Sequence, residues 1–371
     1  MKSKIVYIIS SIYKALAFEW IAEQLNKEKF ELSFILLNSG NSELENFLLG
    51  KGISVNRIQL NGKKSWPSAF FKIVSYLKKH KPDIIHCHLL DASILGLLAG
   101  KLVGIKKRIY TRHHSDYHFR YFPKGIKWDK LCNRMATCIV SPSLAVKEIL
   151  LNLENVSPQK VSLIHHGFDI DYFDDVSPER IAALKEKYHT KGHYPVVGVI
   201  SRFTELKGIQ YIIPAFERIL KSHPTALLLL FNAKGDYETQ IKSQLKCLPK
   251  SNYRMVSFEN DLSAVYKLFD VFVQVSTDRN IEAFGQTYVE ALAAGVPSVF
   301  TLSGIANEFI VDGENALVVP FKDAEAIYFS IKRILSEPDL REHLKQNGYQ
   351  SVKENFGLEK MIHQLELLYA G

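Results

Sequence analysis

The chain contains 371 residues, of which 47% are hydrophobic and 23% charged, and it carries a formal net charge of +8. This length exceeds the usual size of one hydrophobic core, so the composition predicts a soluble globular protein of two domains. The apolar run Ile5–Ser10 is short, and no window approaches the roughly 20 apolar residues of a membrane-spanning helix, so we expect neither a membrane span nor a secretory signal. We therefore expect cytoplasmic residence. The four cysteines have neither metal-site nor disulfide spacing and are expected to be reduced.

The charge is unevenly distributed along the chain. Residues 1–192 contain 29 basic and 18 acidic residues, whereas residues 193–371 contain 18 and 21. The first half is thus strongly basic, which favours an anionic partner such as a membrane surface, a phosphorylated lipid or a polyanionic glycan. A solvated basic surface without a partner is the alternative.

Short apolar runs alternate with helical patterns in the first half. This alternation predicts β-α repeats around a parallel sheet. The expected strands are Lys4–Ser10, Leu32–Leu37, Asp83–Cys87, Lys107–Thr111 and Thr137–Ser141. The expected helices are Trp20–Leu25, Pro67–Leu77, Ala92–Val103 and Leu144–Leu153.

A polar stretch over Asp169–Tyr194 predicts a linker between a first domain, residues 1–168, and a second, residues 195–355. A second series of strands and helices follows it. The expected strands are Val196–Ser201, Ala226–Phe231, Tyr253–Phe258, Val271–Val275, Ser298–Phe300 and Ala316–Val319, with helices at Ile209–Leu220 and Ala324–Leu335. The pattern predicts two doubly wound α/β domains that face a ligand-binding cleft beyond the carboxyl ends of the strands.

Two carboxylates eight residues apart surround a Phe-Gly turn at the start of an Ala-rich helix. Glu282 precedes Phe284-Gly285, and Glu290 lies on the helix that begins near Gln286. Glycine permits a tight turn, and the unpaired amides of a helix N-terminus attract phosphate. This pattern favours a sugar nucleotide, with a carboxylate for hydroxyl groups on each side of a diphosphate. A capping Glu and an ordinary exposed helix Glu are the alternative interpretation.

Two cations, Arg202 and Lys207, follow an expected strand and flank the start of a helix. Both can converge on one diphosphate and offset the charge that builds on a departing nucleoside diphosphate. Alone, such a pair is more often solvated than functional. The basic pair together with the Glu282–Glu290 segment is a more specific signal for a sugar-nucleotide site than either feature alone.

The chain resembles the retaining glycosyltransferases of family 4, which have the GT-B fold with two Rossmann-like domains. The resemblance covers nearly the whole length. It depends on the Glu-x7-Glu pattern at Glu282 and Glu290, on Arg202 and Lys207, and on weaker matches at residues 166–169, 270–273, 303–308 and 312–316. It implies that a C-terminal helix, residues 356–371, packs back on the first domain.

The resemblance also implies roles for individual residues. Glu282 would contact the transferred sugar, Glu290 the ribose, and Arg202 and Lys207 the diphosphate. The donor would also meet the backbone of Phe284, Gly285, Gln286 and Thr287. His113, in Thr111-Arg112-His113-His114, would lie at the reaction centre, where an imidazole orients a sugar hydroxyl or stabilises positive charge at the anomeric carbon. Ser11, Arg112 and His114 are expected on the acceptor side.

We expect no metal and no other cofactor. His86 and His88 alternate along a strand and are interpreted as pointing to opposite faces, which disfavours a metal site there. No Asp-x-Asp element occurs in a metal-holding context.

Three departures from the family pattern affect sugar or acceptor choice. Residues 10–13 lack the usual glycine pair. The segment over residues 275–281 is longer than usual in the family and lacks proline, and only Gly304 remains of a glycine-rich turn.

Aromatic and basic residues alternate over residues 117–128, directly after His113. This segment is suited to stack on a glycan acceptor or to enter a membrane interface. A second such region, around Trp66, Phe70 and Phe71 with lysines at 63–81, is better interpreted as an amphipathic helix with a wet lysine face. No nucleic-acid-binding motif surrounds these residues, so no nucleic-acid partner is expected.

The sequence therefore predicts a metal-independent hexosyltransferase that moves a sugar from a nucleotide donor, UDP-linked rather than GDP-linked, to a lipid-linked or cell-surface glycan precursor. It would be cytoplasmic and peripheral at the inner face of the membrane. A catalytically inactive GT-B module that binds sugar nucleotide or glycan as a regulator or scaffold is the rival prediction. A phosphorylase or epimerase of the same fold is a third, although no lysine for pyridoxal phosphate is evident.

Overall fold

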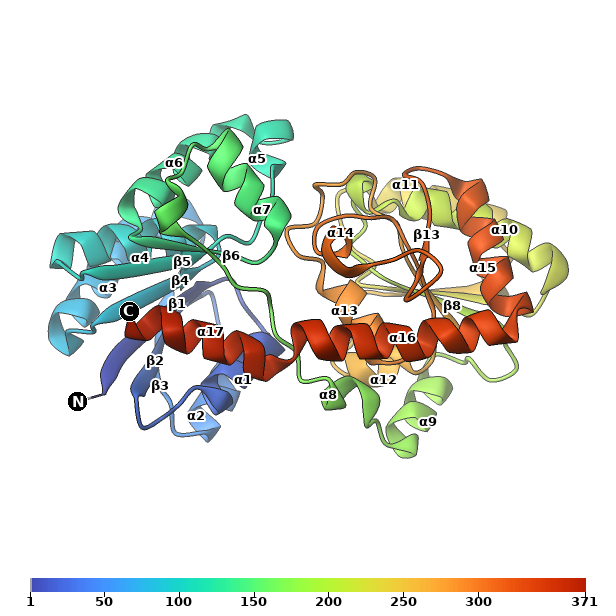
Figure 1. Ribbon diagram of the computed structural model, residues 1–371, viewed down its shortest axis with the longest axis horizontal. Coiled ribbons are helices and arrows are strands. Elements are labelled where there is room, and N and C mark those ends of the chain that lie inside the picture. Colours follow the sequence, from blue (N-terminus) through green and yellow to red (C-terminus); the bar gives the residue numbers. More distant parts are fainter. Residues whose placement is uncertain (1) are drawn as a thin grey trace. The chain divides into compact units, whose positions relative to one another are not determined.

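The computed structural model describes residues 2–371, which divide into two compact units (Figure 1). The N-terminal unit contains residues up to Gly167 together with Leu358–Gly371, and the C-terminal unit contains Phe168–Gly357. Residues 169–194, expected to form a linker, instead form two helices of the C-terminal unit, α8 (Asp171–Asp174) and α9 (Pro178–Lys187). Ser177 caps α9 by accepting a hydrogen bond from the Arg180 amide, so this charged segment has a helix start of its own.

The N-terminal unit contains a parallel sheet of seven strands in the order β3-β2-β1-β4-β5-β6-β7. The strands are β1 (Ser3–Ser10), β2 (Phe30–Asn38), β3 (Ser54–Gln59), β4 (Ile84–His88), β5 (Lys107–Thr111), β6 (Cys138–Ser141) and β7 (Val161–Leu163). The interior strands are apolar on both faces because helices cover both sides, as parallel sheets require (Figure 1).

The helices of this unit pack their apolar faces on the sheet and on one another. They are α1 (Leu16–Gln24), α2 (Glu43–Gly50), α3 (Trp66–His80), α4 (Leu90–Val103), α5 (Tyr117–Arg120), α6 (Ile126–Met135), α7 (Leu144–Glu148), which continues as a π-helical turn over Ile149–Leu153, and α17 (Leu358–Ala370). In α3, Ala69, Ile73, Val74 and Leu77 are buried while the lysines are exposed, which confirms the amphipathic interpretation.

The terminal helix α17 belongs to the N-terminal unit although 190 residues of the other unit separate it from β7 in sequence. It packs against α1, and Met361, Ile362, Leu365 and Tyr369 join the core beside β1 and β2. The expected helix over residues 356–371 is therefore present, starting at Leu358.

The C-terminal unit contains a parallel sheet of six strands in the order β10-β9-β8-β11-β12-β13. The strands are β8 (Val196–Ile200), β9 (Leu227–Phe231), β10 (Tyr253–Val256), β11 (Val271–Gln274), β12 (Ser298–Phe300) and β13 (Leu317–Val318). The main helices are α10 (Ile209–Ser222), α11 (Glu238–Gln244), α12 (Leu262–Tyr266), α13 (Gln286–Ala293), α14 (Ala306–Phe309), α15 (Ala324–Ser336) and α16 (Pro338–Phe356). Each unit is thus an open, doubly wound α/β domain, as the sequence predicts. Within residues 2–371, no helix combines the length and apolar content needed to cross a bilayer.

Candidate active site

Side chains of opposite charge meet at the carboxyl edge of the C-terminal sheet. Glu282 lies in the loop between β11 and α13 and is 7% exposed. Its Oε1 accepts hydrogen bonds from Lys207 Nζ at 2.5 Å, Ser276 Oγ at 2.7 Å and Gln274 Nε2 at 3.4 Å. Burial by itself would raise the pKa of Glu282, but Lys207, Ser276 and Arg202 outweigh it and hold the pKa below its ordinary value. The carboxylate is therefore ionised at neutral pH.

The two cations of this cluster follow β8: Arg202 precedes a single 3-10 turn (Glu205–Lys207), and Lys207 is the last residue of that turn. Arg202 is exposed, and its guanidinium acts on Glu282 electrostatically but forms no hydrogen bond or ion pair with the described residues 2–371. The Lys207 side chain keeps 20% of its surface exposed. Because an ammonium group has three donors, Lys207 can bind an anion while it remains bonded to Glu282.

Two glycines shape the backbone around Glu282. Gly285 has φ +92° at the N-cap of α13, where no side chain caps the first amides, which leaves them available to a ligand. Gly304 has φ +58°, and a Cβ there would lie 2.6 Å from the Phe284 carbonyl oxygen. The next amide, of Ile305, donates to that same oxygen at 2.8 Å. The turn at Gly304 therefore holds the Glu282 loop against the sheet.

Glu290 occupies the second turn of α13 and is 9% exposed. Its Oε2 accepts a hydrogen bond from the Tyr266 hydroxyl at 2.7 Å. Burial raises the pKa of Glu290 to about 7, against the opposing effect of the Tyr266 hydrogen bond. Glu282 and Glu290 therefore differ in charge near neutral pH, since the first is compensated by cations and the second by a hydroxyl group.

Imidazole rings gather at the carboxyl edge of the N-terminal sheet. His113 follows β5, and its Nε2 lies 3.2 Å from Nδ1 of His88 at the end of β4. The rings of His113 and His166 stack with centroids 6.0 Å apart. Burial lowers the pKa of His113 to about 3, and the nearby imidazoles of His166, His86 and His114 add to this effect. His113 is therefore a neutral imidazole at physiological pH.

The expectation that His86 and His88 point to opposite faces of their strand is wrong. Residues i and i+2 of a strand share a face, and these two rings lie with centroids 4.3 Å apart. His86 is 1% exposed and bonds Tyr369 on α17 through Nδ1 at 2.7 Å and Thr111 through Nε2 at 2.8 Å. Burial lowers the pKa of His86 to about 3. This ring is therefore part of the core, directly beside His88.

Arg112 is not available to an acceptor, contrary to expectation. It is 2% exposed, and its guanidinium forms ion pairs with Glu154 and, at 3.1 Å, with Asp129. Its Nε also donates to the His114 carbonyl oxygen at 3.1 Å. A buried guanidinium needs such partners to offset its desolvation. Arg112 therefore anchors the loop after β5 from inside the unit.

Asp129, on α6, is the second anchor of this loop. It accepts hydrogen bonds from His118 Nδ1 at 2.6 Å and from His114 Nε2 at 3.1 Å. The ligand atoms of these three residues lie within 4.8 Å of one another, a spacing that a metal ion can use. Arg112 already supplies a positive charge to the same carboxylate, which disfavours a second cation there. We therefore interpret the three residues as a hydrogen-bonded support.

Comparison with known proteins gives the chain its family. A family model described as Glycosyl transferases group 1 matches residues 181–351, and one described as Glycosyltransferase Family 4 matches residues 20–172.

The chain belongs to the group 1 glycosyltransferases.

Relatives of this glycosyltransferase are named for the synthesis of polysaccharide and of glycolipid. It is 25% identical to the capsular polysaccharide biosynthesis glycosyltransferase CapM of Staphylococcus aureus over 81% of the chain and 80% of that protein. It is 25% identical to the alpha-monoglucosyldiacylglycerol synthase of Acholeplasma laidlawii over 80% of the chain and 77% of that protein. The crystal structure of Anabaena HepE in complex with UDP and glucose matches 99% of both chains with a TM-score of 0.86 and 19% identity. WaaG, a glycosyltransferase involved in lipopolysaccharide biosynthesis, matches with a TM-score of 0.75 and 14% identity. The glycosyltransferase therefore has the GT-B fold.

The remaining predicted residues of the glycosyltransferase differ in what they can offer a ligand. The Phe284 side chain is 4% exposed and packs on Phe168 and Phe356, so only its backbone is available. Gln286 is exposed at the start of α13, and Thr287 donates a hydrogen bond to Gln274. On the N-terminal unit, Ser11 is exposed with φ +54°, while His114 is only partly exposed.

Sequence reasoning missed several members of these clusters. Gln274 ends β11 and Ser276 lies two residues further on, so the two side chains point to the same side, from which both donate to Glu282; this alternation could have identified them. His88 is named from the sequence but assigned to the wrong face relative to His86, and its position at the end of β4 could have placed it beside His113. Tyr266 has no such signal because only the packing of α12 on α13 brings it to Glu290.

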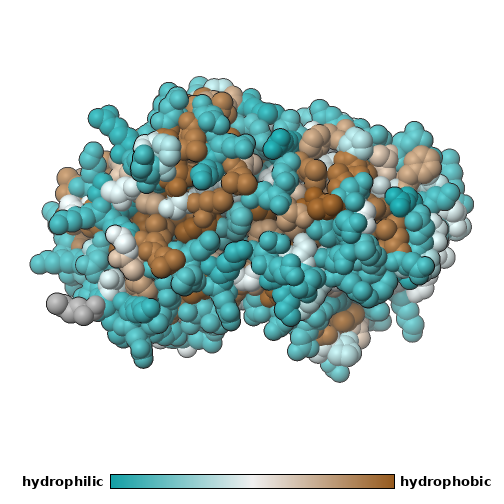
Figure 2. Space-filling view, in the orientation of Figure 1, coloured by the Kyte–Doolittle hydropathy of each residue, from teal (hydrophilic) through white to brown (hydrophobic). Residues whose placement is uncertain are grey.

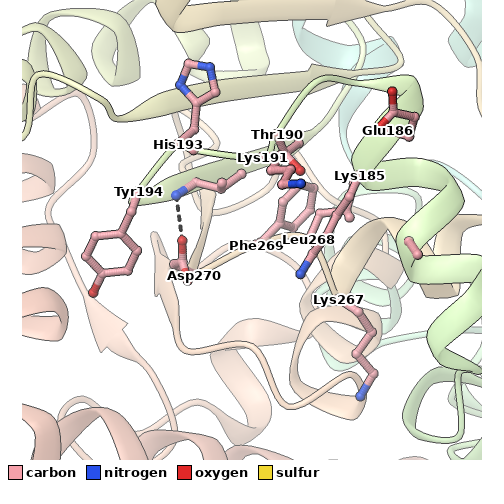
Figure 3. A pocket seen from close by; sticks show the side chains of 13 residues that line it. Lys185, Glu186, Thr190, Lys191, His193, Tyr194, Lys267, Leu268, Phe269 and Asp270 are labelled. Carbon is pink, nitrogen blue, oxygen red and sulfur yellow. Dashed lines mark hydrogen bonds between the residues drawn. The ribbon is translucent and has the colours of Figure 1, made fainter.

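A further cavity of the C-terminal unit lies at the opposite, amino edge of its sheet (Figure 3). Its volume is about 590 Å³, and its lining includes Lys185, Lys191, Lys267 and Asp270. Asp270 precedes β11 and accepts a hydrogen bond from the Val196 amide at 2.7 Å, which joins the starts of β8 and β11. None of the predicted donor-binding residues lines this cavity, and the hydrogen bond from the Val196 amide gives Asp270 a structural role in the glycosyltransferase.

Proposed function

We propose that this glycosyltransferase moves a sugar from a nucleoside diphosphate donor to a hydroxyl group, with retention at the anomeric carbon and without a metal ion. UDP is favoured over GDP as the donor's nucleotide. The acceptor is a lipid-linked or cell-surface glycan precursor.

The observation that carries this proposal is the cluster of Lys207, Arg202 and Glu282 at the carboxyl edge of the C-terminal sheet. Cleavage of the bond between a sugar and a diphosphate leaves negative charge on the departing phosphate. Two cations beside the uncapped start of α13 stabilise that charge in a site where little reorganisation is needed. The ionised Glu282 next to them accepts hydrogen bonds from sugar hydroxyl groups.

Glu290 is the candidate ligand for the ribose. A carboxyl group with a pKa of about 7 exists in both protonation states near neutral pH. Its ionised form accepts hydrogen bonds from the vicinal hydroxyl groups of a ribose. The crystal structure of HepE in complex with UDP and glucose, together with a relative from Escherichia coli that is named as a UDP-Gal transferase, supports the preference for UDP.

His113 is the candidate contact on the acceptor side. Its pKa of about 3 makes it a neutral hydrogen-bonding group, so it is suited to orient a sugar hydroxyl. A charge-stabilising role at the anomeric carbon is then limited to the dipole of a neutral ring. No carboxylate of the described clusters is an evident covalent nucleophile, so we assign none.

The proposed acceptor class, a lipid-linked or cell-surface glycan precursor, is supported by the names of the relatives and by the charge of the chain. The relatives are named for capsular polysaccharide, glucosyldiacylglycerol and a diphosphoundecaprenol-linked sugar, which share a glycan or lipid acceptor. The basic first half of the chain suits an anionic membrane surface that presents such an acceptor.

Variants of the two cations test the diphosphate role. Lys207→Ala and Arg202→Ala are each expected to lower donor hydrolysis and transfer by about 100- to 1,000-fold, since loss of one charge-stabilising donor has that effect. Lys221→Ala is the control because Lys221 is exposed at the end of α10. The measurement is release of free UDP or GDP from a panel of nucleotide sugars, with thermal shift by UDP and GDP. Near-normal turnover in both variants would rule out the proposed site.

The inactive-module alternative predicts nucleotide binding without any release of free nucleoside diphosphate. The gathered charges of Lys207, Arg202 and Glu282 favour the enzyme.

Chelation tests metal independence: activity after dialysis against EDTA is expected to be unchanged. Loss of activity that zinc restores would contradict this prediction and point to His114, His118 and Asp129.

A further inference from the structure

A row of neutral imidazoles leads from the interior of the N-terminal unit to its carboxyl edge. His86 and His88 end β4, His113 follows β5 and His166 follows β7. His88 is the link between the buried and the partly exposed rings. It is 4% exposed, and the rings of Tyr7 and Phe18 lie 5.0 and 4.8 Å from it.

The hydrogen bond between His88 Nδ1 and His113 Nε2 needs one proton between the two nitrogens. The other ring nitrogen of His88, Nε2, is buried and has no hydrogen-bond partner among residues 2–371. A buried N–H group without an acceptor is among the rarest features of folded proteins, and an unused lone pair is more tolerable. The proton of neutral His88 therefore lies on Nδ1, and His88 donates to His113.

The tautomer of His113 follows from this donor. Because its Nε2 accepts, the single proton of the neutral ring lies on Nδ1. That nitrogen has no protein partner among residues 2–371 and is not among the buried polar atoms that lack one, so it is open to a ligand. Burial keeps the pKa of His88 well below its ordinary value and that of His166 at about 4, so no neighbouring imidazolium disturbs this arrangement.

We propose that His88 is a positioning residue, which fixes His113 as the Nδ1–H tautomer so that His113 donates a hydrogen bond to a sugar oxygen. This inference deepens the proposed function and depends on it for the identity of the ligand. His86 lies on the interior side of this pair. Its hydrogen bond to Thr111 joins β4 to the end of β5, and its hydrogen bond to Tyr369 joins β4 to α17.

Two substitutions of His88 separate the effect of its hydrogen-bond donor from the effect of its side-chain volume. In His88→Asn the side-chain amide places an N–H donor near the position of Nδ1, whereas His88→Leu keeps a similar volume without a donor. We expect kcat of His88→Leu to fall about 10- to 100-fold, by analogy with the loss of a group that orients a metal-bound histidine. His88→Asn should recover most of the activity, and KM for the nucleotide donor should change in neither variant.

The tautomer itself is measured without any substrate. Two-dimensional NMR of protein with ¹⁵N-labelled histidine distinguishes Nδ1–H from Nε2–H rings, and His113→Ala identifies the signals. The wild-type protein should show His113 as Nδ1–H, and His88→Leu should move it toward Nε2–H, the form that prevails in water. An Nε2–H signal in the wild type overturns the inference, even if a variant fails to fold.

The outcomes distinguish this inference from the proposed function. Transfer that His113→Ala abolishes and His88→Leu leaves intact would overturn the positioning role and leave the glycosyltransferase proposal standing. Absence of transfer from every donor in the wild type, with the Nδ1–H signal present, would contradict the proposed function and leave the tautomer assignment standing.

Discussion

At the scale of single residues, environment separates side chains of the same type. Glu282 and Glu290 are both buried carboxyl groups eight residues apart, yet the pKa of the first is lowered and that of the second is raised to about 7. The difference is the partner: Lys207 supplies a full positive charge to Glu282, whereas Tyr266 supplies one hydroxyl hydrogen bond to Glu290. A buried charge is tolerated only when it is compensated.

Glu290→Gln should therefore stabilise the protein at alkaline pH. The folded-state pKa lies above the unfolded value, so the contribution of Glu290 to stability is complete below pH 4.5 and is lost as pH rises through 7. We expect the variant to exceed the wild type in free energy of unfolding by on the order of 3 kcal/mol at pH 8 to 9, with little difference at pH 4.5 to 5. Gln also retains an acceptor for Tyr266.

Urea unfolding at the two pH values measures this effect, with Glu217→Gln on the exposed face of α10 as control. Affinity for UDP should fall at the same time if Glu290 binds the ribose. A variant that is no more stable than the wild type at pH 8 to 9 would show that burial does not raise the pKa of Glu290.

At the scale of elements, backbone geometry decides where ligands can approach. The start of α13 is open because Gly285 turns the chain at φ +92° and carries no side chain over the first amides. A Cβ at this position would lie 2.6 Å from the Tyr288 ring, which is fully buried. At the other end of α13, Gly295 also has a positive φ of +69°, but nothing lies within 4 Å of its Cβ position.

These two glycines form a matched pair of substitutions. Gly295→Ala should cost only the strain of its φ, about 1 kcal/mol of stability, with unchanged affinity for UDP. Gly285→Ala adds the clash with Tyr288 and shifts the helix start, so we expect at least tenfold weaker binding of UDP as well. Titration calorimetry and thermal unfolding of both variants provide the comparison. Equal affinities would remove α13 from the donor site.

The terminal helix α17 is also an element with a specific polar attachment. The Tyr369 hydroxyl bonds the Tyr7 hydroxyl on β1 and Nδ1 of His86 on β4. Tyr369→Phe leaves both partners buried without this bond and should cost about 1 to 3 kcal/mol of stability. Tyr121→Phe, at an exposed tyrosine of the same unit, should have no effect. Chemical denaturation measures both, and equal stabilities would assign α17 a purely apolar attachment.

At the scale of the whole molecule, basic charge and exposed aromatic side chains occur together in the N-terminal unit. The aromatic residues that are more than 40% exposed include Tyr117 on α5, Tyr121 and Phe122 directly after it, and Phe71 on α3. Trp66 of α3 contacts Trp128 of α6 edge to face, with ring centroids 5.6 Å apart, which joins the two aromatic segments. Apolar patches are visible among hydrophilic side chains on this unit (Figure 2). Such a surface is suited to an anionic lipid interface.

Vesicle flotation tests that prediction. The protein should float with vesicles that contain anionic phospholipid and not with neutral vesicles, and binding should weaken as salt rises. Tyr121→Ser combined with Phe122→Ser should reduce binding, whereas Phe329→Ser, at an exposed phenylalanine of the C-terminal unit, should not. Equal recovery with both kinds of vesicle would exclude an electrostatic membrane contact.

Much of the fold could be predicted from the sequence because interior parallel strands are apolar on both faces. β5 and β12 have the expected bounds, and the other predicted strands differ by only a few residues. The two strands that the sequence did not reveal, β3 and β7, lie at the two edges of the N-terminal sheet. Edge strands need less apolar surface, and in β3 only Ile58 is buried, while Ser54, Arg57 and Gln59 are exposed. The linker prediction failed for a related reason, since charged residues also form capped surface helices.

Local spacing and periodicity were sufficient to identify the family and the doubly wound architecture, and to predict the charged residues of the proposed donor site. Which of those charges are compensated follows only from the packing of the folded chain. It placed Arg112 inside the unit, beside Glu154 and Asp129, and His88 against His113. Those pairings join residues from different elements. The protonation state of each residue depends on its burial and its partners, which the local sequence does not specify.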